Sequence, residues 1–127
     1  YQTQGKWDLA KVLIHCAQSV DYSIQGYPQH KSDFFKKTIG SLAFSMFESK
    51  KKMTHGLDEA IPGAPDIANN QSLTDAITRL EKSLLDFKHY QGKLAPHFAY
   101  GELSKAQYSL AHVMHFNNHL KEIDLIS

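Results

Sequence analysis

Apolar side chains recur every three or four positions in four segments of the chain, which is the spacing of one face of an α-helix. No segment shows the alternation of apolar and polar residues, bounded by turn residues, that is typical of β-strands. The pattern therefore predicts an all-α fold, with helices over about residues 7–25, 32–52, 72–91 and 104–124.

Residues with strong preferences for helix ends mark the limits of these segments. Ser32, Ser72 and Ser104 stand where an N-cap side chain accepts a hydrogen bond from the first turn. Gly26 and Gly92 follow the first and third helices, as glycine commonly does at a helix C-terminus. The apolar positions, helix by helix, are Leu9, Leu13, Cys16, Val20 and Ile24; Phe35, Ile39, Leu42, Ala43, Met46 and Phe47; Leu73, Ile77, Leu80, Leu84 and Phe87; and Leu110, Val113, Phe116, Leu120 and Ile123.

The second and third helices are separated by a segment, residues 54–70, that is rich in glycine, proline and asparagine. Such a density of helix and strand breakers predicts a long crossover loop. Its residues 61–65 are apolar and rigid, so we expect this part to pack across the helices rather than extend into solvent. Neither half of the chain has enough amphipathic helix to close a core alone, which favours one helical bundle domain over residues 1–127.

The composition narrows the classes of function. A chain of 127 residues, 42% hydrophobic and 21% charged, is typical of one globular domain. The net charge of +1 offers no field for nucleic acid, and no apolar run reaches the roughly 18 residues of a membrane span. We therefore expect neither nucleic acid nor a membrane as a partner. A small-molecule substrate and a homodimer are compatible with the sequence. The single cysteine excludes a disulfide scaffold and leaves the compartment open between cytoplasm and periplasm.

Histidine is the unusual residue type, with eight in the chain. At about 100° per residue, His119 lies about 40° and His112 about 60° from His115 around the last helix. His115 and His119, spaced H-x-x-x-H, project from consecutive turns and can bind one metal ion together. Such a pair also arises by chance among eight histidines. A third ligand from another helix would separate the two cases, and His15 is the candidate, although periodicity alone favours a structural histidine over a ligand at this position.

Other polar residues have weaker functional interpretations. His112 is close enough to the pair to line the same pocket, where a supporting or core-edge role is favoured over metal ligation. His97 either caps the loop before the last helix or faces the pocket. Cys16 points about 100° away from His15 and is expected to be a buried core thiol. Further candidates are Tyr22 and Tyr108, as donors to a bound anion or as buried core; Asp8 and Glu122, as proton acceptors or supporting groups; and His30, His55 and His89, as solvated side chains.

Three stretches of the chain together resemble the DinB-like superfamily of metal-dependent proteins, and within it a bacterial branch of unknown function. They are WDLAKVLIHCAQS at residues 7–19, PHFAYG at 96–101 and AHVMHFNNHL at 111–120, in the same order as in the family. The resemblance implies a four-helix bundle in which an early histidine and a late H-x-x-x-H bind a divalent metal. The matching positions are His15, His115 and His119.

Zinc suits three neutral imidazoles, and nickel, iron and manganese are alternatives with the same ligand type. Relatives in the superfamily are thiol-dependent transferases and isomerases, so the resemblance implies a metal-dependent hydrolase or thiol-dependent transferase that activates water or a thiol. The alternative is a noncatalytic metal-binding or interaction bundle. The chain departs from the family where only six residues precede Trp7, so an N-terminal helix is expected to be absent or truncated. Asn118 and Glu122 replace a histidine and a glutamine of some members.

Overall fold

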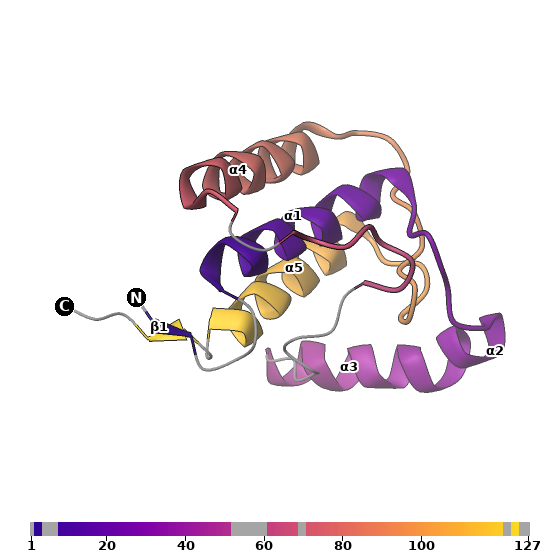
Figure 1. Ribbon diagram of the computed structural model, residues 1–127. Helices are drawn as coiled ribbons and strands as arrows, with labels where there is room; N and C mark the ends of the chain where they lie inside the picture. The colour runs from indigo at the N-terminus through magenta and orange to yellow at the C-terminus, as the bar shows by residue number, and fades with distance from the viewer. Residues whose placement is uncertain (1, 4–7, 52–60, 69–70, 121–122, 125–127) are drawn as a thin grey trace.

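The computed structural model describes residues 2–3, 8–51, 61–68, 71–120 and 123–124. This part of the chain is mostly helical, which confirms the all-α class. Helix α1 packs against both α4 and α5, and Figure 1 shows α1 between them. None of the described helices has the length and apolar character needed to cross a membrane. The helices are α1 (Leu9–Gln25), α2 (Asp33–Phe35), the π-helix η1 (Lys36–Gly40), α3 (Ser41–Lys50), α4 (Leu73–His89) and α5 (Lys105–Leu120).

The predicted N-cap serines are confirmed. In each case the Oγ accepts a hydrogen bond from the backbone N–H three residues later, which satisfies one of the unpaired donors of a first helical turn. At α1 the cap is Asp8, and the helix ends before Gly26, whose φ of 104° favours glycine. Trp7 lies outside the described residues. The serine contacts are Ser32 to Phe35 at 3.1 Å, Ser72 to Asp75 at 3.3 Å and Ser104 to Gln107 at 3.1 Å.

The second predicted helix is interrupted, because residues 36–40 form the π-helix η1 between α2 and α3. A Cβ on Gly40 would overlap the carbonyl oxygen of Ala99, so glycine lets the two backbones approach closely. A π-turn adds one residue and rotates the residues after it by roughly 100°. Phe44 is consequently buried, whereas Leu42 and Met46 of the predicted apolar face are exposed.

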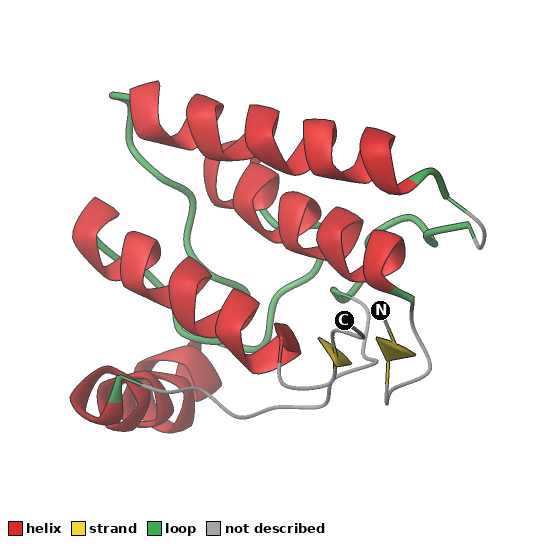
Figure 2. Cartoon of the chain, turned by 90° about the vertical axis from the view of Figure 1, so that its left-hand side faces the viewer, coloured by secondary structure: helices red, strands yellow, loops and turns green. Residues whose placement is uncertain are grey.

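The last helix ends at Leu120 rather than at the predicted Asp124. Ile123–Asp124 (β2) instead pairs antiparallel with Gln2–Thr3 (β1). The expectation that the chain contains no strand is therefore wrong at these four residues. The pair lies near both marked chain ends in Figures 1 and 2, and it is too short to leave an alternating pattern in the sequence.

The expectation that residues 61–65 pack across the helices is confirmed. Ile61 is 5% exposed and belongs to a core cluster that includes Val20 and Tyr108. The side-chain amide of Gln18 donates to the carbonyl of Pro65 at 3.3 Å, which ties this segment to α1. The rest of the predicted crossover loop lies partly outside the described residues.

The apolar pattern of α4 and α5 agrees with the buried positions only in part: Phe87 is buried, and Leu80 and Phe116 pack against the core. Leu84 of α4 and Val113 of α5 are about half exposed, because they line an apolar groove of about 320 Å³ between the two helices. The face of α5 that is buried most deeply instead carries Tyr108, Met114 and His119. The histidine-bearing side of the last helix therefore points into the protein.

Candidate metal centre

His15 occupies the middle of the most deeply buried helix. Every residue of α1 from Val12 to Val20 is buried, as expected for a helix that is covered on several sides by α4, α5 and the 61–68 segment. His15 itself is buried and faces α5. The packing of α1 against α5 thus brings a residue near the start of the chain beside the last helix.

His115 and His119 meet His15 from consecutive turns of α5. His119 is fully buried, and His115 is partly buried. The Nε2 of His115 lies 3.0 Å from the Nε2 of His15 and 3.2 Å from the Nε2 of His119. The three ring planes are inclined to one another by 65° to 79°, with ring centroids 4.8 to 4.9 Å apart. The structure therefore brings all three predicted residues together.

The three histidines fit the requirements of a divalent metal ion. One ring nitrogen from each lies within 4.8 Å of the ring nitrogens of the other two. Ligands of a tetrahedral zinc ion, each about 2.0 to 2.1 Å from the metal, lie about 3.3 Å from one another. The two Nε2 separations of 3.0 and 3.2 Å are close to this spacing. Three neutral nitrogen donors also match the ligand set of catalytic zinc sites, which leave a fourth position for water or substrate.

A cavity of about 300 Å³ reaches this cluster from one side. His15 and His115 line the cavity, whereas His119 lies behind them and is fully buried. Tyr27 and Lys31, from the segment between α1 and α2, also line it. Sequence reasoning missed both residues, since the chain between two helices carries no periodicity that reports which way a side chain points.

His112 lies in the cavity wall and outside the three-histidine cluster. Its Nε2 lies 3.3 Å from the Oγ of Ser23, which itself donates to the carbonyl of Val20. The Ser23 oxygen must therefore accept the proton of His112 Nε2, so the Nδ1 of a neutral ring holds a lone pair. Burial lowers the pKa of His112 to about 4, so the ring stays neutral at neutral pH.

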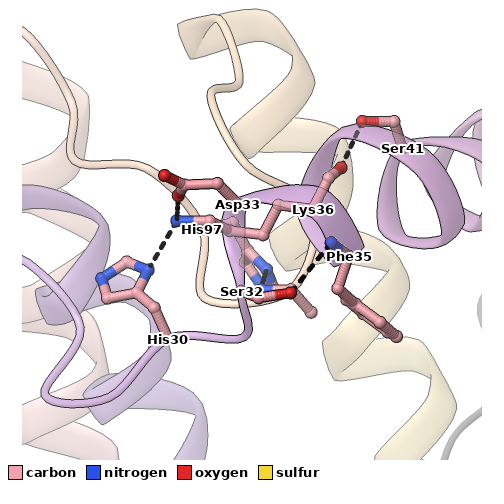
Figure 3. A network of polar contacts seen from close by, with 8 residues as sticks. His30, Ser32, Asp33, Phe35, Lys36, Ser41 and His97 are labelled. Carbon is pink, nitrogen blue, oxygen red and sulfur yellow. Dashed lines mark hydrogen bonds and ion pairs between the residues drawn. The ribbon is translucent and has the colours of Figure 1, made fainter.

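His97 fulfils both roles that the sequence left open. Its Nδ1 accepts hydrogen bonds from the backbone N–H groups of Ala99 and Tyr100, each at 3.1 Å, and its ring lines the cavity. The backbone of His97 also pairs with Gly101 in both directions. Burial, with smaller contributions from His112 and His30, lowers the pKa of His97 to about 3. Figure 3 shows His97 beside the start of α2.

The remaining candidates have structural roles. Asp8 is the N-cap of α1 and accepts a hydrogen bond from the Lys11 N–H at 2.8 Å, so its expected role near the site is not supported. Tyr108 is fully buried and donates to the Ala95 carbonyl at 2.7 Å. Cys16 is buried, which confirms the expected core thiol, and burial raises its pKa to about 12. Tyr22 is partly buried against the core, and His30 and His89 are exposed. His55 and Glu122 lie outside the described residues.

Comparison with known proteins adds a family but no reaction. A family model described as a protein of unknown function, DUF1569, matches residues 1–124, so the chain belongs to this family. No curated protein and no solved structure matches the chain.

Proposed function

For this member of the DUF1569 family we propose a metal-binding function, in which His15, His115 and His119 hold one divalent metal ion, with zinc preferred. The observation that carries the proposal is the convergence of three imidazoles from two helices, with Nε2 atoms 3.0 and 3.2 Å apart. Among the described residues, these three are the histidine, cysteine or acidic side chains whose ligand atoms lie close enough together to hold one metal ion. The order of the three motifs further supports a place for the family in the DinB-like superfamily.

We further propose that the site is catalytic and activates water or a thiol. A zinc ion held by His15, His115 and His119 would supply a water or thiol that loses its proton near neutral pH. The fully buried His119 closes the cluster from behind, while His15 and His115 face the cavity, so a small molecule reaches the site from the cavity. The neutral His112, with a lone pair on Nδ1, would accept a hydrogen bond from a substrate in this cavity.

Metal content tests the first proposal. The protein, without a histidine tag and purified without added metal, should contain close to one equivalent of metal by mass spectrometry. His15→Ala should lose this metal, and His89→Ala, which removes an exposed histidine from the end of α4, should keep it. A wild-type protein that stays metal-free after incubation with zinc and gel filtration would refute the proposed site.

The alternative is a metal-binding bundle without turnover. A structural zinc ion has four protein ligands, whereas the three histidines with an adjacent cavity leave one position open, which favours catalysis. Cobalt-substituted protein distinguishes the two. On addition of 2-mercaptoethanol, an open site should develop a sulfur-to-cobalt charge-transfer band and changed visible bands. Bands that respond neither to the thiol nor to pH would indicate a closed, noncatalytic site.

A further inference from the structure

His97 lines the cavity and carries a ring hydrogen-bond donor. Its Nδ1 accepts two backbone N–H groups, so in the neutral ring the proton resides on Nε2. Within the part of the chain that the structure describes, no group accepts a hydrogen bond from this Nε2. Because burial keeps the ring neutral, His97 acts as an uncharged donor with a single defined tautomer.

The ring of His97 is held in one orientation. It stacks on Tyr100, with centroids 4.3 Å apart and planes at 12°, and on Phe98, with centroids 4.5 Å apart. The backbone turn beneath it is closed by the paired hydrogen bonds with Gly101 and is packed against Gly40. A donor fixed in this way binds an acceptor without first having to be ordered, which favours affinity.

Most of the cavity wall is apolar, and its polar side chains besides His97 include Ser19, His15, His112 and His115. Its walls include aromatic and aliphatic side chains such as Tyr27, Phe98 and Ile61. Of the lysine, arginine and acidic residues that the structure describes, Lys31 is the one that lines the cavity. Lys31 is exposed, and its Nζ lies 5.7 Å from the centroid of the Phe35 ring, which is outside the cavity wall. The Lys31 backbone N–H donates to the Phe98 carbonyl at 2.9 Å, which joins Lys31 to the turn that carries His97. A volume of about 300 Å³ is at the small end of ligand pockets.

We infer that this cavity binds a small, mainly apolar carboxylate, with one oxygen accepting a hydrogen bond from His97 Nε2 and with Lys31 supplying the opposite charge. The apolar part of the molecule contacts the aromatic walls. The cavity is shared with His15 and His115, so this carboxylate would also be the substrate class of the metal site. That part of the inference rests on the proposed function. As a binding site, it stands on His97, Lys31 and the walls alone.

The test uses NMR of protein that is ¹⁵N-labelled in its histidine rings. The free protein should show His97 with its proton on Nε2. Titration with phenylacetate should shift this Nε2 resonance, and the uncharged phenylacetamide should bind more weakly. His97→Asn keeps an acceptor where Nδ1 lies, and so retains the backbone turn, but lacks the distal donor. It should weaken phenylacetate binding by about tenfold or more.

Two further variants separate the donor from the fold. His97→Gln, whose amide nitrogen reaches the position of Nε2, should recover part of the affinity, and His89→Asn should bind as wild type does. An unshifted Nε2 resonance, equal binding by phenylacetamide, or unweakened binding by a folded His97→Asn protein would each overturn the inference. Metal content measured on the same samples keeps the two proposals apart. A metal-free protein that binds phenylacetate through His97 refutes only the metal site, and a metal-loaded protein that ignores phenylacetate refutes only the carboxylate site.

Discussion

Replacing His119 by alanine tests the metal site most directly. The side chain is fully buried, and its Nε2 lies 3.2 Å from that of His115. Its removal leaves His15 and His115, too few ligands for tight binding. The core clusters around α1 are built from apolar residues of several elements and do not include His119, so the variant should stay folded.

The expected loss of stability has two separable parts. A metal ion present at 100 times its dissociation constant stabilises the folded state by about 2.7 kcal/mol. For 127 residues, at an unfolding entropy of about 2.1 cal/mol/K per residue, this corresponds to about 10 °C in melting temperature. Truncation of a fully buried side chain also leaves a cavity, which costs about 2 to 4 kcal/mol with or without metal.

Thermal unfolding followed by far-ultraviolet circular dichroism, with zinc and with EDTA, separates the two parts. The wild-type protein should melt about 10 °C higher with zinc than with EDTA, and His119→Ala should show almost no difference between the two. His119→Gln, which preserves more side-chain volume, should regain stability in EDTA without regaining much metal. A His119→Ala protein that keeps a full metal complement, or that zinc stabilises as much as it does the wild type, would show that His119 is not a ligand.

Three further predictions concern the fold and its titration. Gly40→Ala places a Cβ against the Ala99 carbonyl, so the free energy of unfolding, measured with denaturant, should fall by about 2 to 4 kcal/mol. A decrease below about 0.5 kcal/mol would contradict the close approach of the two backbones. Cys16, buried and with its pKa raised to about 12, should react with a thiol reagent only when the protein unfolds, and rapid labelling of folded protein would disprove this. The unfolded chain protonates His97 and His112 near pH 6.5, above their folded pKa values of about 3 and about 4. Stability in EDTA should therefore be highest above pH 6.5 and fall toward pH 4 by about 1.4 kcal/mol per pH unit for each histidine, and His97→Asn should remove one of these contributions. An unchanged slope in that variant would refute a neutral, buried His97.

Much of the fold could be predicted because helix formation depends on near neighbours. The apolar spacing located the helices, and Ser32, Ser72 and Ser104 marked their starts, since a cap acts within a single turn. The i, i+4 spacing of His115 and His119 likewise placed both rings on one side of the last helix. These features require no knowledge of the rest of the chain.

Which helix face became buried was decided by tertiary contacts. The π-turn before α3 arises where Gly40 meets Ala99, a residue far along the chain, and it turns Phe44 rather than Leu42 toward the core. Leu84 and Val113, apolar in pattern, line an open groove between α4 and α5. Periodicity reports that a helix has an apolar side, whereas the packing partners decide how much of that side is covered.

The candidate site divides in the same way. By itself, the sequence determined that His115 and His119 share one side of a helix and that His15 borders an apolar face. Only the tertiary structure decided that His15 meets His115, at a sequence separation of 100 residues, and that His97 both caps a turn and lines the same cavity. The physical reason is that a helix sets directions over a few residues through its own geometry, while the meeting of distant residues depends on how whole helices pack.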